Sequence, residues 1–158
     1  RAERYRARDL RRDPRVLLVP GHRLETILSE RHRWQYAECE NGGDAMKPYI
    51  APLGVALGHL QQATMWLMQN ALAKPDNAGA AATDYMQLFG LVTFAYMWAR
   101  MAKVAQDKIA GSGATPYLTT KLVTGRFFME RMLPETHVHL ARIQTGCATT
   151  MELAAEAF

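Results

Sequence analysis

Histidine and carboxylate residues in the second half of this chain are the ones whose chemistry could serve metal binding. His137 and His139 lie two residues apart, whereas metal ligands on one helix face are separated by three or four residues. Glu135 precedes His139 by four residues, and not by the three of the Glu-x-x-His pattern of di-metal bundles. No carboxylate occupies an expected core-facing position of the other helices. The spacing therefore predicts no metal site, and we expect both histidines to be ordinary surface residues.

Four polar residues lie in or beside apolar stripes of the sequence: Gln69, Asn70, Asp84 and Arg100. One interpretation is acid–base catalysis, but Asp84 has no suitable partner at a useful helical spacing. Because an unpaired buried polar group is costly, the favoured interpretation is hydrogen bonding that fixes how helices pack. The sequence also contains no glycine-rich phosphate loop, nucleophile elbow or paired-cysteine motif.

The composition is that of a single globular domain. The chain has 158 residues, of which 49% are apolar and 22% charged, with a formal net charge of +4. Such a modest charge does not by itself indicate a nucleic-acid partner. Cys39 and Cys147 are the only cysteines, which favours a reducing compartment and a cytoplasmic location, with one disulfide between them as the alternative. No secretory signal is evident, and the longest apolar run, Tyr85–Ala99, is too short to cross a bilayer comfortably.

Residues 1–46 differ in composition from residues 47–158, so we divide the chain there. Ten arginines and no lysine precede residue 42, which predicts a solvated segment that is partly helical or disordered. Phosphate binding by these arginines is an alternative, although Glu3, Asp9 and Asp13 dilute the charge. A further hypothesis is that this segment is read from a shifted frame. The chain begins with Arg1, which indicates a fragment of a longer protein.

The first helical pattern runs from Ala51 to Lys74, because apolar residues recur at alternating steps of four and three. This stripe consists of Leu53, Leu57, Leu60, Thr64, Leu67 and Ala71. We expect Pro48 and Pro52 to stand at the helix start and not in its interior. Pro75 is expected to end the helix.

A second helix follows, capped by Asp76 or Asn77. Its stripe repeats the four-three spacing at Ala81, Tyr85, Leu88, Val92, Ala95, Ala99 and Ala102. Leu91, Phe94, Met97 and Trp98 widen the apolar surface, so we expect this helix to be central and to touch more than one neighbour.

The third helix is predicted to begin at Thr115–Pro116, a capping hydroxyl followed by proline. Its stripe comprises Leu118, Leu122, Gly125, Met129 and Met132. Pro134 either kinks or ends this helix, and Gly146 is a natural stop. Long amphipathic helices with short connections predict an all-α fold, an antiparallel three-helix, or possible four-helix, up-down bundle.

Several phrases of this sequence resemble the extra C-terminal domain of the larger bacterial acyl-CoA dehydrogenases, including the 3-methylmercaptopropionyl-CoA dehydrogenase-like enzymes. They are LQQATMWLMQNAL (60–72), DNAGAAATDYMQLFGL (76–91), YMWARMAK (96–103), RFFMERMLPE (126–135) and AAEAF (154–158). The resemblance covers about residues 52–158. It implies a helical accessory domain of a flavoenzyme that oxidises an acyl-CoA at its alpha and beta carbons, passing electrons through FAD.

The resemblance places the flavin and the catalytic base in an upstream dehydrogenase core, so no catalytic, cofactor or metal residue carries over to this chain. We expect the domain to be inactive alone, to pack on that core and to belong to a homo-oligomer. Residues predicted to serve helix packing or domain contacts are Trp66, Met68, Asn70, Asp84, Phe89, Trp98, Arg100, Phe127 and Met132. The alternative is a stand-alone bundle whose methionine-rich surface binds a partner helix or an acyl ligand.

Overall fold

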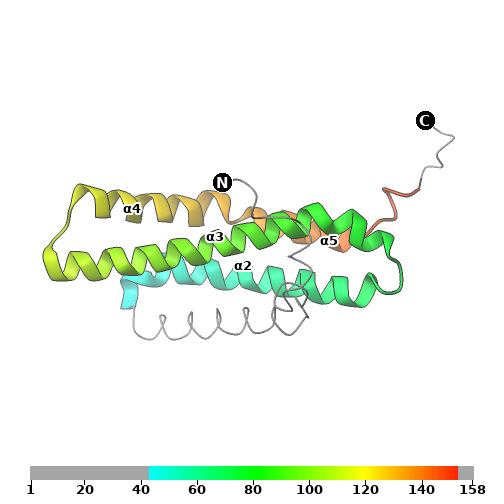
Figure 1. The fold of residues 1–158 in the computed structure, drawn as a ribbon, viewed down its shortest axis with the longest axis horizontal. Helices are drawn as coiled ribbons and strands as arrows, with labels where there is room; N and C mark the ends of the chain where they lie inside the picture. The colour runs from blue at the N-terminus through cyan, green and yellow to red at the C-terminus, as the bar shows by residue number, and fades with distance from the viewer. Residues whose placement is uncertain (1–42, 153–158) are drawn as a thin grey trace, which may run out of the picture. The chain divides into compact units, whose positions relative to one another are not determined.

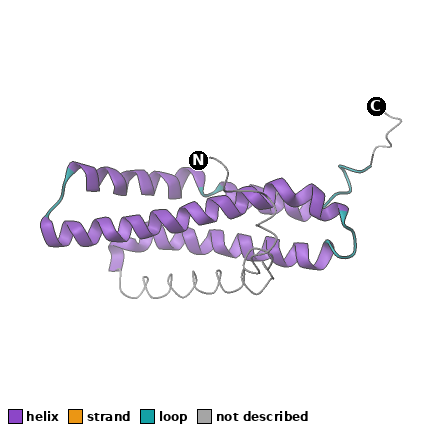
Figure 2. Cartoon of the chain, viewed as in Figure 1, coloured by secondary structure: helices purple, strands orange, loops and turns teal. Residues whose placement is uncertain are grey.

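The computed structural model describes residues 43–152, which form helices joined by short turns, with no strand among them (Figures 1 and 2). In order they are α2 (Gly43–Asn70), α3 (Asp76–Ser112), α4 (Pro116–Phe127), the π-helical turn η2 (Phe128–Met132) and α5 (Glu135–Thr145). The predicted all-α bundle is confirmed. The predictions for residues 1–42, Cys39 included, lie outside the described residues.

Helix α3 is the central element of the bundle. It packs against α2, α4, η2 and α5. Figure 1 shows α2 running beside α3, while α4 and α5 follow one another as a third rod. This third rod packs against α3 and, mainly through α5, against α2 as well. The architecture is therefore three antiparallel rods, of which the third is interrupted. The prediction that the middle helix touches more than one neighbour is confirmed.

The expected start of the first helix was wrong. Helix α2 begins at Gly43, so Pro48 and Pro52 both lie in its interior. Each proline lacks the N–H that would bond the carbonyl four residues earlier. Burial offsets this loss, because the side chains around the prolines are completely enclosed: Met46, Tyr49, Ile50 and Leu53.

The expected end of the first helix, and the capping of the next, were also wrong. Helix α2 ends at Asn70, well before Pro75, and Pro75 itself occupies the position that precedes α3. No side chain caps α3 there. Asp76 and Asn77 therefore lie within its first turn, where the Asp76 carboxylate complements the positive end of the helix dipole.

The core consists of the stripes that the four-three spacing predicted. On α3 every predicted position is buried except Tyr85, whose hydroxyl lies 2.9 Å from that of Thr64 on α2. Five of the buried α3 residues are alanines, which lets the neighbouring rods approach the helix closely. The leucines at the centre of α2, Leu53, Leu57 and Leu60, fill the space between them.

The third rod follows its predicted stripe only as far as Met129. At η2 the amide of Leu133 bonds the carbonyl of Phe128, five residues earlier, and this wider turn shifts the phase of every later residue. Leu133 therefore points into the core, whereas Met132 is 44% exposed. The prediction that Met132 continues the stripe was wrong for this reason. Pro134 then separates η2 from α5, and the predicted stop at Gly146 is confirmed by its positive φ of 70°.

Candidate functional site

A polar cluster joins α3 to α5. The Asp84 carboxylate lies 2.8 Å from Nδ1 of His139 and 3.5 Å from the Arg142 guanidinium. The Asp84 and His139 side chains are only 22% and 13% exposed. His139 is therefore not the surface histidine that we expected. Its partner is 55 residues away along the chain, beyond the reach of a helical-spacing argument.

An Asp–His pair also occurs in hydrolases, where the carboxylate orients a histidine that activates a nucleophile. That chemistry needs a serine or cysteine within hydrogen-bond reach of the second imidazole nitrogen. The contacts of the described residues place no such group on His139. The arrangement instead holds two helices together, as the sequence analysis favoured for Asp84.

A second polar contact joins α2 to α5 through Thr136. The Thr136 hydroxyl donates its single proton to the carbonyl of Leu133 at 2.8 Å. It must therefore accept from Nδ1 of His59, 3.0 Å away. This fixes the tautomer of His59 and leaves Nε2 without a proton. Burial, together with the nearby His137, lowers the pKa of His59 from its ordinary value of 6.5.

His59 and His137 lie beside a small apolar cavity. Their ring centroids are 5.9 Å apart, and the cavity of about 270 Å³ is otherwise lined by Pro52, Val55, Ala56, Met129, Leu133, Pro134 and Thr136. Within residues 43–152, no three His, Cys, Asp or Glu side chains gather closely enough to hold a metal ion. A two-histidine pair alone falls short of the usual four-coordinate site.

The three rods come close together at Gly125. A Cβ atom at this position would come within 3.2 Å of the Tyr49 ring and 3.3 Å of the Trp98 ring. The hydroxyl of Tyr49 donates to the carbonyl of Leu122 at 2.8 Å, which ties α2 to α4. Burial is the main reason that the pKa of Tyr49 is raised above 10.0. Gly125 was predicted as a stripe position and Trp98 as a packing residue, whereas Tyr49 was not predicted to take part.

Asn77 links the ends of three elements, a role that the sequence analysis mistook for helix capping. Its side-chain oxygen accepts from the backbone amide of Cys147 at 3.0 Å, and its nitrogen donates to the carbonyl of Asn70 at 3.3 Å. Cys147 is a buried free thiol.

The residues predicted for packing or domain contacts fall into two groups. Five of them are partly buried within the bundle: Trp66, Asn70, Asp84, Phe89 and Trp98. The other four are exposed: Met68, Arg100, Phe127 and Met132. Of the exposed ones, Arg100 lies over the Tyr96 ring at 5.8 Å.

Helix α3 carries a second apolar stripe on the face opposite its buried stripe. We call it the outer stripe, and it consists of Met86, Gly90, Phe94, Met97, Met101 and Val104. The steps between these residues are four, four, three, four and three. The large side chains of this stripe are between 37% and 65% exposed. A helix that is apolar on two opposite faces is typical of one covered on both sides.

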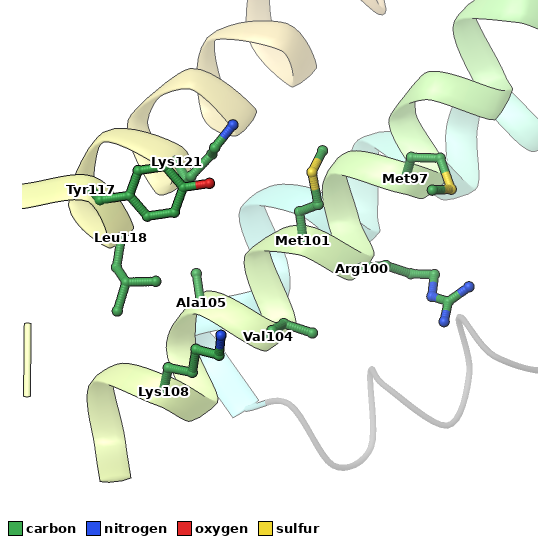
Figure 3. A pocket seen from close by; sticks show the side chains of 9 residues that line it. All are labelled: Met97, Arg100, Met101, Val104, Ala105, Lys108, Tyr117, Leu118 and Lys121. Atoms are coloured by element: carbon green, nitrogen blue, oxygen red, sulfur yellow. The ribbon is translucent and has the colours of Figure 1, made fainter. Parts of the chain in front are cut away.

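The outer stripe borders a groove between α3 and α4 (Figure 3). The groove has a volume of about 310 Å³ and is lined by Met97, Arg100, Met101, Val104, Ala105, Lys108, Tyr117, Leu118 and Lys121. In Figure 3, Tyr117, Leu118 and Lys121 of α4 face Met101, Ala105 and Lys108 of α3, whereas Arg100 extends away from α4. Among the described residues, no carboxylate lines the groove.

The fold and these contacts define an all-α bundle domain whose polar groups join its helices to one another. The sequence profile described as "Acetyl-CoA dehydrogenase C-terminal like" matches residues 28–154, most of the chain. The chain therefore belongs to this family. The predicted resemblance to the C-terminal domain of acyl-CoA dehydrogenases is confirmed at the level of the family. The match begins within the arginine-rich segment, earlier than the resemblance indicated.

A search of curated proteins finds none that matches this chain. Among the described helices, none combines the length and hydropathy that a bilayer crossing requires.

Proposed function

We propose that this chain is the C-terminal accessory domain of an FAD-dependent acyl-CoA dehydrogenase of the 3-methylmercaptopropionyl-CoA dehydrogenase-like kind. Its work is to pack on the dehydrogenase core and stabilise or assemble the enzyme. The observation that carries this proposal is the outer stripe of α3. Contiguous exposed apolar surface of this kind marks an interface, and the family is one of C-terminal domains.

The chemistry of the parent enzyme is assigned to the core and not to this chain. FAD bound there would accept the electrons removed from the alpha and beta carbons of an acyl-CoA. The described residues do not fit a flavin: they offer helices and short turns, without a glycine-rich backbone loop for a pyrophosphate. The parent is proposed to be a cytoplasmic homo-oligomer, in which this domain contributes contacts and no catalytic group.

Co-expression with the dehydrogenase core encoded with this chain tests the proposal. We expect the two to co-purify and the core to melt at a higher temperature than it does alone. The chain alone should be colourless and give no acyl-CoA-dependent dye reduction. A yellow, catalytically active preparation of the isolated chain would overturn the proposal, as would a core that neither binds this chain nor gains stability from it.

One observation favours a second candidate, a stand-alone bundle that binds a partner helix or an acyl ligand. Methionines line the groove between α3 and α4, and methionine suits adaptable binding surfaces. A monomer with a cooperative melt at high concentration would favour this candidate. Concentration-dependent association would favour the accessory domain, because its apolar stripe would lack the core that covers it.

A further inference from the structure

We infer that the groove between α3 and α4, continued by the outer stripe, docks an acidic amphipathic helix. This inference rests on the proposed function in one respect, since under that proposal the docked helix belongs to the dehydrogenase core. Three properties of the surface favour such a helix: its length, its charge and the way its cations are held.

The length of the outer stripe fits a helix better than a small ligand. From Met86 to Val104 the stripe spans 19 residues, or about 27 Å at the rise of an α-helix. Its steps of four and three residues match the apolar spacing of a helix lying nearly parallel to α3. The exposed Phe94 ring stacks edge-on against Phe128 at 6.4 Å, so this middle part of the stripe is held in place before a partner arrives.

The charge of the groove specifies the polar residues of the docked helix. Lys108 lies at one end of the groove on α3 and Lys121 lies opposite on α4. Helix α4 contains no Asp or Glu. The nearby Asp107 carboxylate is already engaged by the Lys103 ammonium at 2.7 and 2.8 Å. The described residues thus offer two ammonium groups beside an apolar floor, which a partner with carboxylates flanking its apolar stripe would complement.

The position of Lys121 is fixed by aromatic rings. Its ammonium lies 5.7 Å from the centroid of the Trp98 ring and 5.5 Å from that of Tyr117. Cation–π contacts of this kind orient the charge without neutralising it. Lys121 therefore stays available to a carboxylate from outside the bundle.

The same charges argue against a second copy of this chain as the occupant. In a two-fold interface the same surface patch meets itself. Two such grooves would bring ammonium groups together, and residues 43–152 supply no lining carboxylate to pair with them.

Binding of designed peptides to the full chain tests the inference. The probe is an 18-residue fluorescent helix with leucines at four-three spacing and flanking glutamates, compared with the same peptide carrying lysines instead. We expect saturable binding of the acidic peptide, weakened by salt, and no comparable binding of the basic one. Equal binding of both peptides would overturn the inference. The inference would also fail if phosphatidylglycerol vesicles displaced the acidic peptide and if charge reversal of the groove left the affinity of that peptide for the chain unchanged.

Charge reversal of the groove provides the residue-level test. The double variant Lys108→Glu and Lys121→Glu should weaken the acidic peptide by about ten-fold or more. The matched control is Lys47→Glu with Lys74→Glu, which has the same net charge but changes α2 and the turn after it, and it should bind as the parent chain does. Thermal melts confirm that each variant is folded, and Lys108→Gln with Lys121→Gln supplies a milder pair. Equal weakening by the groove and control variants would contradict the inference.

The apolar half of the surface has its own pair of variants. Met97→Gln with Met101→Gln should weaken binding of the acidic peptide, whereas Val55→Gln, at an exposed position on α2, should not.

Binding of the dehydrogenase core distinguishes this inference from the proposed accessory role. If the core binds the groove-reversed chain normally, the inference fails and the accessory role stands. If the acidic peptide binds in the groove but the core does not bind at all, the accessory role fails.

Discussion

At the scale of single residues, the bundle depends on a few positions where one atom decides how closely two rods approach. Gly125 is the clearest, since the Tyr49 and Trp98 rings both lie within 3.4 Å of where its Cβ would be. Both contacts are with atoms of rigid aromatic rings, and not with the end of a flexible side chain that could move aside. A methyl group here would separate α4 from both α2 and α3.

We therefore expect Gly125→Ala to destabilise the domain by about 1–3 kcal/mol, the usual cost of overpacking a core. The matched control is Gly58→Ala on α2, where an added Cβ meets no atom within 4 Å. That change should stabilise the domain by about 0.5–1 kcal/mol, because alanine is the better helix former. Urea unfolding midpoints measure both variants, and a gain in stability from Gly125→Ala would contradict the packing described.

Residue types and local spacing predicted some of these positions and not others. The stripe that contains Gly125 follows from periodicity, and the Thr115–Pro116 start is confirmed by the Thr115 hydroxyl accepting from the amide of Leu118. Asn77 is different. Its type indicated a cap, but its two hydrogen bonds reach Asn70 and Cys147, and no local pattern encodes such a tertiary contact.

At the scale of whole elements, polar side chains decide how α5 is attached to the two longer helices. Asp84 on α3 and His59 on α2 each bond a residue of α5. Alanines make up much of the α3 surface facing these rods. Small apolar residues permit several registers, so these hydrogen bonds select one of them.

Removing the carboxylate from the link between α3 and α5 should destabilise the folded domain. We expect Asp84→Ala to lower the free energy of unfolding by about 1–3 kcal/mol, because His139 would lose its partner in a largely buried position. The control is Asp107→Ala, which breaks the exposed Lys103 pair and should cost about 0.5 kcal/mol or less. Chemical denaturation at neutral pH compares them, and equal losses would refute the structural role of the link.

The link between α2 and α5 should make stability depend on pH. The pKa of His59 in the folded chain lies below its ordinary value of 6.5. Between these two pKa values the unfolded chain therefore binds a proton at His59 that the folded chain does not bind. The contribution of His59 is thus fully present above pH 6.5 and is lost as the pH falls through the folded pKa. His137 of α5 faces His59 and adds to the effect.

Melting temperatures between about pH 5 and pH 8 measure this dependence, the range where histidine titrates. We expect His59→Gln to flatten the part of the curve below pH 6.5 relative to the parent chain, since glutamine has no proton to gain. His137→Gln should flatten it less, because burial remains the larger cause. Parallel curves for the parent chain and His59→Gln would show that His59 titrates alike in both states.

The phase of the third rod shows where periodicity stops being informative for an element. Residues before η2 obey the predicted stripe, and Gly125 and Met129 are buried as expected. One bond from Leu133 to Phe128 then changes the phase. A single π-turn of this kind leaves no distinct repeat in the sequence.

At the scale of the whole molecule, the described helices bury one face of α3 and leave another apolar face exposed. The four-three spacing predicted the buried face and the all-α fold, and the breadth of the apolar surface on the middle helix was also expected. Periodicity alone could not show that Phe94 and Met97 point outward, because a wide apolar surface is consistent with any number of internal neighbours. Only the arrangement of the rods reveals that these residues are exposed.

The exposed face leads to a prediction for the isolated chain of 158 residues. We expect sedimentation to show association that grows with concentration and has no fixed stoichiometry, because the outer stripe offers apolar contact but like charges oppose a defined pair. Met97→Gln with Met101→Gln should reduce this association and leave the free energy of unfolding within about 0.5 kcal/mol, since both side chains are substantially exposed. Leu72→Gln, at an exposed turn residue remote in sequence from the stripe, is the matched control and should not reduce it. A monomer at every concentration, or equal effects of the two changes, would mean that this face is not an interface, and the accessory role would then lose the observation that carries it.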